Sequence, residues 1–317
     1  MVEFYRGFLM AADSVRTEGV SLEIYALDSG TTPAEMSEVL RRGEMARMDC
    51  IVGPGIPSQA AVLAKFCSQW GIQLLMPFNT PVAGDRNLPS VFENVAPQEV
   101  TYAGVVQLLL ENFPDANFVF LTTKQQEARG VALQQNLKER LDDYGLYYST
   151  LDVRDGYDEA LETLDKTHKN VILMDTPGGA TLSSVSSFLL TLKSEHPSYD
   201  ISLVGFPEWL SLGAQYTAQL HALDTYVFST FYNNPLSGHS LRFNQSYRSN
   251  FKQVPLSSNP SIAMTGFDLG LFAMQSVSVK PLQHGFAFRQ ESADSPFVNH
   301  FVQLVHFQPN KIVSLVR

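Results

Sequence analysis

Short polar and charged side chains follow the ends of several predicted strands. Ser58 would cap a helix, where its hydroxyl and the free backbone amides of the first turn favour a carboxylate. Glu208 follows another strand end, where a carboxylate suits a cation in a desolvated cleft, and Trp209 could supply an aromatic wall or a cation–π face. Asn79 and Thr80 add short polar groups just past a third strand end. These residue types indicate recognition of a small charged molecule.

Each of these residues also has an ordinary structural interpretation. Ser58 can be a plain N-cap, and turn chemistry explains Asn79, Thr80 and the proline after them equally well. Glu208 can interact with a helix dipole while Trp209 packs in a core. Loop or packing roles are the commoner interpretation of four further polar residues at strand ends or crossings, namely Thr123, Gln125, Thr176 and Tyr232.

Patterns for catalysis are missing from the sequence. It contains no GxSxG, HExxH, CxxC, Walker or GxGxxG motif, and Gly53-Pro54-Gly55 is too short and too proline-blocked to cradle phosphates. The seven histidines are scattered, and His300 and His306 lack a third metal ligand. We therefore expect no catalytic residue, no metal and no cofactor.

Composition excludes further classes of protein. The chain has 317 residues, of which 44% are hydrophobic and 17% charged, so it can build sizeable cores and favours two domains. Its net charge of −10 is unsuited to binding nucleic-acid phosphates. No apolar run approaches the roughly 20 residues needed to span a bilayer, so we expect no membrane insertion. No secretory leader opens the chain, which is expected of a cytoplasmic protein, a mature form or a fragment.

The two cysteines allow one disulfide at most. Cys50 begins a predicted strand and Cys67 lies near the end of the helix that returns beside it. A bond between them is geometrically possible, but two buried thiols are the commoner arrangement.

Helix and strand patterns alternate along nearly the whole chain. Short strands that are apolar on both faces, separated by helices of 10 to 18 residues, are typical of parallel sheets that are covered on both faces. The predicted helices include 2–17, 58–70, 98–113, 127–144, 158–167, 180–193 and 260–277, and the predicted strands are 22–28, 50–52, 72–76, 117–122, 147–152, 170–175, 201–205 and 225–231, before a terminal hairpin around Pro309-Asn310.

The alternation predicts an α/β protein with two doubly wound lobes. We expect lobe 1 to comprise residues 1–114 and 232–288, and lobe 2 to comprise residues 115–231 and 289–317. A doubly wound domain normally begins with a strand, whereas this chain begins inside a predicted helix. We therefore expect the opening strand to lie upstream of Met1; the alternative is a domain that begins with a helix.

Several segments together resemble the type I periplasmic binding proteins, in particular their branched-chain amino-acid-binding branch. They are IVGPGIPS (51–58), LLMPFNTP (74–81) and VFENVAPQ (91–98), in the order and at the spacing found in that family. A Bacteroidetes subgroup, whose members often carry LysM repeats upstream, is resembled by FYRGFLMAADS (4–14), GFPEWLSL (205–212) and STFYNNP (229–235).

The resemblance implies two lobes joined by three chain crossings, with a ligand bound at the carboxyl ends of the strands. Thr80 matches the family's ligand-contacting threonine, and Glu208 matches the acidic residue aimed at a ligand ammonium. Phe78 replaces a small residue of the amino-acid binders, so their ligand pose does not carry over directly.

We therefore expect a non-enzymatic, extracytoplasmic solute-binding module that closes on a small zwitterionic or peptide-like ligand, such as an amino acid, a short peptide or a cell-wall fragment. The resemblance implies a membrane transporter as one partner and peptidoglycan, held through upstream LysM repeats, as another. Two alternatives are a cell-envelope interaction module that has lost small-molecule binding and an enzyme acting on envelope polymers.

Overall fold

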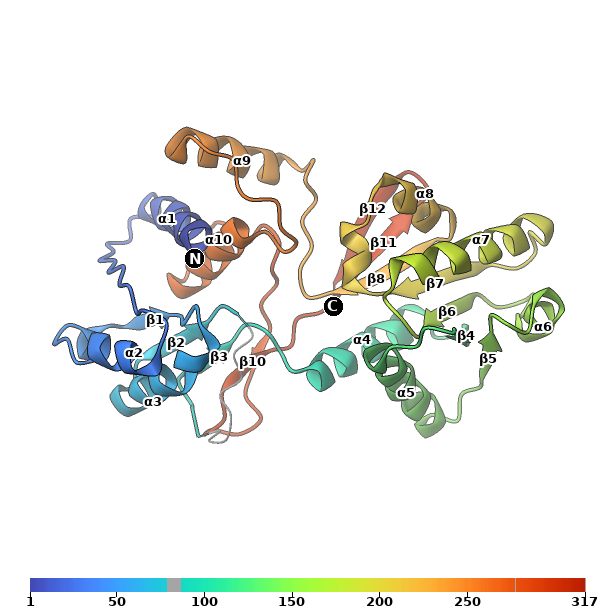
Figure 1. Cartoon of the computed structure of the whole chain (residues 1–317), viewed down its shortest axis with the longest axis horizontal. Coiled ribbons are helices and arrows are strands. Elements are labelled where there is room, and N and C mark those ends of the chain that lie inside the picture. Colours follow the sequence, from blue (N-terminus) through green and yellow to red (C-terminus); the bar gives the residue numbers. More distant parts are fainter. Residues whose placement is uncertain (79–86, 277, 317) are drawn as a thin grey trace. The chain divides into compact units, whose positions relative to one another are not determined.

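The computed structural model describes residues 1–78, 87–276 and 278–316 and divides into two compact units (Figure 1). Unit 1 comprises Met1–Gln98 and Phe231–Phe301, and unit 2 comprises Glu99–Thr230 and Val302–Arg317. The chain therefore passes from one unit to the other three times, as the family resemblance implies. Among the described residues, no helix combines the length and hydrophobicity that a membrane span requires.

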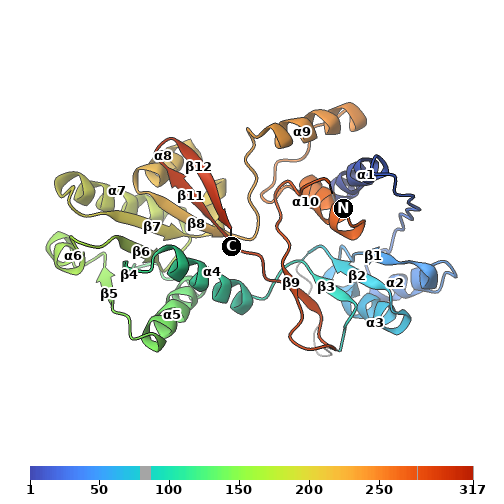
Figure 2. The same cartoon turned by 180° about the vertical axis from the view of Figure 1, so that it is seen from behind.

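Unit 1 is built on a five-stranded sheet of order β1-β2-β3-β10-β9. Neighbouring strands run parallel except at β9, which is antiparallel to β10 and lies at one edge (Figure 2). The strands are β1 (Cys50–Val52), β2 (Gln73–Met76), β3 (Val91–Glu93), β9 (Phe288–Arg289) and β10 (Phe297–Asn299).

Helices cover both faces of this sheet because successive strand residues, which point to opposite faces, are apolar. Leu74 and Met76 of β2 pack with α2 and α3, whereas Leu75 faces the other way, toward α1 and α10. The helices of unit 1 are α1 (Val2–Arg16), α2 (Pro33–Leu40), α3 (Ala60–Trp70), α9 (Gly238–Phe251) and α10 (Ile262–Ala273), with short 3₁₀ helices η1 (Met45–Arg47) and η2 (Pro57–Gln59).

Two glycines let α1 and α10 approach until their backbones touch. A Cβ on Gly7 would lie 1.8 Å from the carbonyl oxygen of Ala263, and one on Gly266 would lie 1.9 Å from that of Phe4. No other residue fits at either position without moving a helix, so the glycines set the distance between these helices.

Unit 2 contains a seven-stranded sheet of order β12-β11-β8-β7-β6-β4-β5. The strands β6, β7 and β8 are buried at every position, which explains their nearly continuous apolar sequences. The parallel strands are β4 (Asn117–Thr122), β5 (Tyr148–Asp152), β6 (Asn170–Met174), β7 (Ile201–Gly205) and β8 (Thr225–Ser229), and the antiparallel hairpin is β11 (Gln303–Gln308) and β12 (Lys311–Val316).

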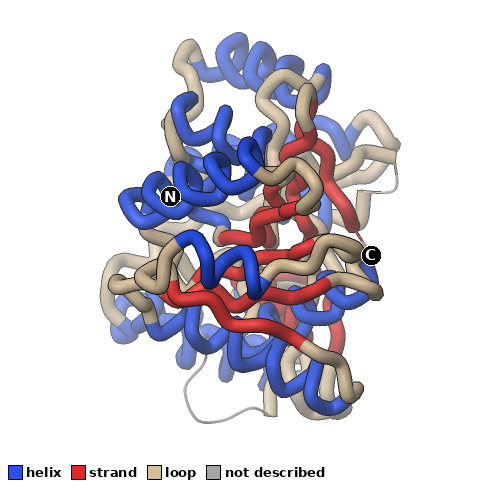
Figure 3. The backbone as a smooth tube through the Cα atoms, turned by 90° about the vertical axis from the view of Figure 1, so that its right-hand side faces the viewer, coloured by secondary structure: helices blue, strands red, loops and turns tan. Residues whose placement is uncertain are grey.

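The helices of unit 2 connect these strands. They are α4 (Gln98–Asn112), α5 (Ala128–Asp143), α6 (Tyr157–Thr163), α7 (Gly179–Glu195), α8 (Ala214–Ala222) and the 3₁₀ helix η3 (Pro207–Ser211). Strands lie between helical layers, as the tube view shows (Figure 3). The predicted terminal hairpin is confirmed, since Gln308 pairs with Lys311 and leaves Pro309 and Asn310 to form the turn.

One predicted strand is wrong. Residues 20–30 form no strand, although the apolar residues at 22, 24 and 25 predict one there. Within the part of the chain that the structure describes, no neighbouring strand pairs with this segment, and an apolar pattern alone cannot make a strand without a partner.

The division between the units also differs from the boundaries predicted at residues 114 and 288. Helix α4 belongs to unit 2, where the Tyr102 hydroxyl donates to the carbonyl of Arg129 (3.0 Å) and its ring meets Phe228 edge-on. Strand β10 belongs to unit 1 because it pairs with β3. Packing, rather than the position of an element in the sequence, decides both assignments.

Both cysteines are free thiols. Burial raises the pKa of the Cys50 thiol to about 11, with a smaller contribution from Asp49, and the pKa of Cys67 to about 12. Such thiols are largely protonated at neutral pH and are correspondingly unreactive.

Candidate functional site

Polar residues gather at the carboxyl edge of the unit 2 sheet. Strands β4, β6 and β7 run parallel, so the loops after them open on the same side. These loops carry the predicted ligand contacts Thr123, Gln125, Thr176, Glu208 and Trp209. The hydrogen bonds described below link these loops to one another.

A buried carboxylate ties the first two loops together. Asp175 is fully buried and accepts two hydrogen bonds of 2.7 Å, one from the backbone N–H of Thr123 and one from its hydroxyl. Helix α5 starts directly against this point, since a Cβ on Gly130 would lie 2.1 Å from the carbonyl oxygen of Asp175. Thr123 is therefore committed to the scaffold of the site.

Thr176 also has internal partners. Its hydroxyl donates to Oε1 of Glu127 (3.0 Å) and accepts from the N–H of Gly178 (3.1 Å). The exposed Gln125 accepts through Oε1 from the hydroxyl of Thr181 (2.8 Å). These contacts fix the loop after β6 to the start of α5.

An ion pair forms the accessible part of the group. The guanidinium of Arg129 donates to Glu208 and lies 3.4 Å from Glu127, and the side chains of Arg129 and Glu208 are 41% and 45% exposed. Burial alone would lower the pKa of Arg129, but hydrogen bonding and charge interaction with Glu208, aided by Glu127, raise it. Two carboxylates share one guanidinium, which gives these three side chains a net charge of −1.

Trp209 lies beneath this surface and is only 1% exposed. Its indole N–H donates to the carbonyl of Pro177 (3.0 Å), and its ring packs so closely on Gly205 that a Cβ there would lie 1.8 Å from it. This burial favours the core interpretation of Trp209 over the aromatic wall.

The predicted contacts of unit 1 are less connected. Ser58 is not an N-cap, because Pro57 begins the 3₁₀ helix η2 one residue earlier, and α3 starts only at Ala60. The exposed Ser58 hydroxyl instead donates to the carbonyl of Thr31 at 3.5 Å. Asn79 and Thr80 lie outside the described residues.

Phe78 and Tyr232 both lie in unit 1. The ring of Phe78 packs edge-on against Phe4, with 5.5 Å between centroids, in the apolar layer under α1 and α10. The backbone N–H of Tyr232 donates to the carbonyl of Gln283 (2.8 Å), and burial raises the pKa of its hydroxyl.

Sequence reasoning missed Asp175, Glu127 and Arg129. A signal for Asp175 exists, since it ends the buried run NVILMD and an unpaired carboxylate is costly at such a position. Glu127 and Arg129 follow the strand NFVFLT by only a few residues, so they belong at the carboxyl edge by the same argument as Thr123.

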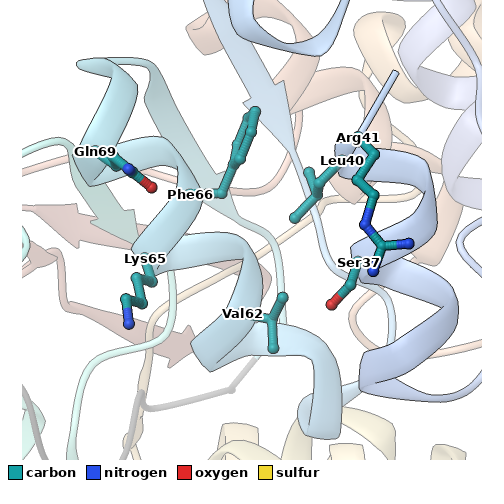
Figure 4. A pocket seen from close by; sticks show the side chains of 7 residues that line it. All are labelled: Ser37, Leu40, Arg41, Val62, Lys65, Phe66 and Gln69. Atoms are coloured by element: carbon teal, nitrogen blue, oxygen red, sulfur yellow. The ribbon is translucent and has the colours of Figure 1, made fainter. Parts of the chain in front are cut away.

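A shallow groove of about 290 Å³ lies between α2 and α3 in unit 1 (Figure 4). It lies between two helices, and none of the predicted site residues lines it, so we do not assign the ligand to it. Its lining residues are Ser37, Leu40, Arg41, Val62, Lys65, Phe66 and Gln69.

No protein-family model matches the sequence, and no curated protein matches it. Solved structures do match over nearly the whole chain. A Rhodospirillum rubrum protein described as a branched-chain amino acid ABC transporter is 11% identical, with a TM-score of 0.59 over 99% of this chain and 94% of that one. A periplasmic ligand-binding protein of a branched-chain amino acid ABC transporter from Burkholderia xenovorans is 11% identical, with a TM-score of 0.55 over 99% and 90%. The chain has the type I periplasmic binding protein fold.

The structure is also similar to a solved protein that is not described as part of an ABC transporter. LpoA of Haemophilus influenzae is 12% identical, with a TM-score of 0.59, and the match covers all of this chain but 56% of that one. Arg129 and Glu208 lie at the carboxyl edge of the unit 2 sheet. Open α/β sheets generally bind their ligands at this edge. At identities this low the likeness establishes the fold and leaves the ligand to chemical argument.

Proposed function

We propose that the chain is a non-enzymatic solute-binding module whose unit 2 binds a small zwitterionic or peptide-like ligand at Arg129 and Glu208. The observation that carries this proposal is the half-exposed ion pair of these two residues at the carboxyl edge of the sheet. A ligand carboxylate can replace Glu208 as the partner of Arg129, and a ligand cation can replace Arg129 as the partner of Glu208.

The charges favour a ligand that brings an ammonium group. Glu127 and Glu208 together outweigh Arg129, so a cation beside Glu208 neutralises the remaining negative charge. Glu127 is already held by Thr176, which leaves Glu208 as the better acceptor. A ligand carboxylate would then take the guanidinium of Arg129, whose planar donors suit it.

Other predicted contacts take different parts in this proposal. Gln125 is exposed, its Oε1 accepts from Thr181, and its amide N–H is proposed to donate to the ligand. Thr123 and Thr176 hold the loops in place. The contacts that we propose for unit 1 are Ser58, Phe78, Asn79, Thr80 and Tyr232.

The proposed setting is the periplasm or cell envelope. The fold is shared with ligand-binding proteins of ABC transporters, which supports a membrane transporter as the partner. The resemblance to the LysM-associated subgroup supports a further association with peptidoglycan, through repeats upstream of the fold.

A thermal-shift screen of amino acids, short peptides and cell-wall fragments tests the proposal. A ligand at 100 times its Kd stabilises the folded protein by about 2.7 kcal/mol, which for domains of this size raises Tm by roughly 5 to 10 °C. Glu208→Gln should reduce the affinity of the hit about tenfold or more. Arg140→Gln, which removes an exposed ion pair at the other end of α5, is the matched control and should leave the affinity unchanged.

A second function is favoured by the internal contacts of the site. Trp209 is buried and Phe78 packs on Phe4, while the hydroxyls of Thr123 and Thr176 donate to carboxylates of the protein itself. Such contacts are expected of an envelope interaction module that no longer binds small molecules. Absence of stabilisation by every compound in the screen would favour this module over the solute-binding one.

A further inference from the structure

Strand β12 forms one edge of the unit 2 sheet. It lies beside β11 (Figure 2), and within the described residues no strand pairs with its other side. Residues 311–316 also make no backbone–backbone hydrogen bond outside this hairpin in the part of the chain that the structure describes. A row of backbone donors and acceptors is therefore open to another strand.

The turn of the hairpin identifies the open groups. Gln308 pairs with Lys311 across a two-residue turn, so the backbone hydrogen bonds that close the hairpin join these two residues. Hydrogen-bonded pairs recur at every second residue of an antiparallel ladder, and the residues between them point their N–H and C=O groups away from the partner strand. In β12 the outward-pointing residues are Ile312, Ser314 and Val316.

The other sheet edges are shorter or more polar. In unit 1 the edge strands β1 and β9 have three and two residues. The opposite edge of the unit 2 sheet is β5, whose five residues, YSTLD, are mostly polar. Strand β12 has six residues, KIVSLV, and its single charge stands at the first position. Proteins usually protect an edge with charges, proline or a short strand, so among the described strands β12 is the edge most open to pairing.

The side chains of β12 leave apolar surface accessible on both faces of the sheet. Val316 is 55% exposed, and Ile312, Val313 and Leu315 are only partly buried. Since successive residues of a strand point to opposite faces, Val313 and Leu315 share one face and Ile312 and Val316 share the other. A strand added at this edge would cover apolar surface on both faces if its own side chains are aliphatic.

The sequence of β12 is complementary to itself. When a second β12 lies antiparallel with Ser314 opposite Ser314, all the outward-pointing residues of both strands fall into hydrogen-bonded pairs. Ile312 then lies opposite Val316, and Val313 lies opposite Leu315, so these facing pairs are aliphatic. A shift by two residues would instead place Ser314 opposite an aliphatic side chain. From this register we propose that the β12 edge binds a second copy of this chain, through antiparallel pairing of the two β12 strands around Ser314.

Self-association measured by sedimentation velocity tests this proposal. The wild type should change from monomer to dimer between about 1 and 300 µM protein. Hydrogen exchange supplies a second measurement, because the outward-pointing amides become donors in the new ladder. The amides of Ile312, Ser314 and Val316 should exchange at least roughly tenfold more slowly in the dimer than in the monomer.

Charges at position 314 test the register. Ser314→Lys and Ser314→Glu each place two like charges opposite one another, so each variant alone should stay monomeric over the same range. An equimolar mixture of the two should form a heterodimer, because opposite charges then face each other. Its formation would also show that both variants are folded.

Two control variants separate charge from other effects. The Ser314 hydroxyl donates to Gln303 within the hairpin, and Ser314→Ala removes this hydrogen bond without adding a charge, so this variant should still dimerise. Thr150→Lys adds the same charge to an exposed residue of β5, at the other edge of the sheet, and should dimerise like the wild type.

Four results would overturn the proposal. A wild type that stays monomeric at the highest concentration would show that the edge does not accept a second copy. Slow exchange of the three amides already in the monomer would show that another part of the chain covers the edge. A dimer that persists in both charged variants would assign the association to another surface. A monomeric mixture of charged variants that are folded by circular dichroism would exclude the register around Ser314.

Discussion

Asp175 shows at the residue scale how the candidate site is held. Its carboxylate satisfies both donors of Thr123, and the backbone beside it receives the start of α5. Arg129 and Glu208 can face solvent because such buried contacts fix the loops beneath them. The residues that hold the loops and the residues proposed to bind the ligand are therefore different.

Asp175→Asn should destabilise unit 2. The asparagine NH₂ would face the N–H or the hydroxyl of Thr123, each of which donates to the Asp175 carboxylate in the wild type. One buried hydrogen bond is therefore lost, at a cost of about 1–3 kcal/mol. Urea unfolding is followed by the fluorescence of Trp209 in a Trp70→Phe background, which removes the other tryptophan of the chain. Asp143→Asn, at an exposed pair on α5, serves as the control and should change stability by less than about 0.5 kcal/mol. Equal effects of the two variants would contradict the assigned role of Asp175.

Helix packing in unit 1 depends on the glycines of α1 and α10. The backbone contact at Gly7 and Gly266 brings the amphipathic helix α1 and the buried helix α10 together over the aromatic face of the sheet. Larger side chains would separate these helices and expose that face.

Gly7→Ala should cost about 1–3 kcal/mol, because its methyl group would overlap the carbonyl of Ala263. Thermal unfolding followed by circular dichroism measures the loss. Gly43→Ala is the matched control, since a Cβ on Gly43 meets nothing within 4 Å. A stability of Gly7→Ala equal to that of the control would contradict the close packing.

The amino edge of the unit 2 sheet carries a second charged group, centred on Asp224. Burial alone would raise the pKa of Asp224, but hydrogen bonds from Ser202 (2.7 Å), His306 (2.6 Å) and Lys169 (3.1 Å) lower it. A carboxyl whose pKa is lower in the folded protein stabilises the fold at pH values above its pKa in the unfolded chain, which is about 4. This stabilisation is lost as the pH falls through the pKa of the carboxyl in the folded protein.

The stability of unit 2 should therefore fall as the pH drops below about 4. Asp224→Asn should be less stable than the wild type at pH 7 and should show a weaker loss on acidification. Urea midpoints at pH 7, 5, 4 and 3 measure both effects. Asp13→Asn, at an exposed pair of unit 1, should keep the wild-type pH dependence, and identical slopes for all three proteins would refute this assignment.

The whole molecule offers no metal site in residues 1–78, 87–276 and 278–316, where no three His, Cys, Asp or Glu side chains are grouped to hold an ion. Stability is expected to come from the two cores and from the charged groups at either edge of the unit 2 sheet. Binding of a ligand at Arg129 and Glu208 would add to that stability directly, without an intervening ion.

Dialysis against a chelator should therefore leave Tm unchanged within about 1 °C, and the ligand-induced shift should be the same before and after dialysis. Differential scanning fluorimetry measures both quantities. A drop in Tm that is restored by one divalent metal would contradict this expectation.

The sequence by itself determined the α/β class, the parallel sheets and the terminal hairpin. Buried runs such as NVILMD and the Pro309-Asn310 turn carry those features locally, because apolar periodicity and turn chemistry act over a few residues. The same patterns placed Thr123, Thr176 and Glu208 at one edge of a sheet, since parallel strands align their carboxyl ends.

Only the tertiary structure decided which of these side chains are accessible. Thr123 is paired with Asp175, which lies 52 residues further along the chain, and Glu208 is paired with Arg129, 79 residues before it. Residues 20–30 fail to form a strand because pairing needs a neighbour that no local pattern supplies. Such partners are set by long-range packing, which apolar periodicity does not encode.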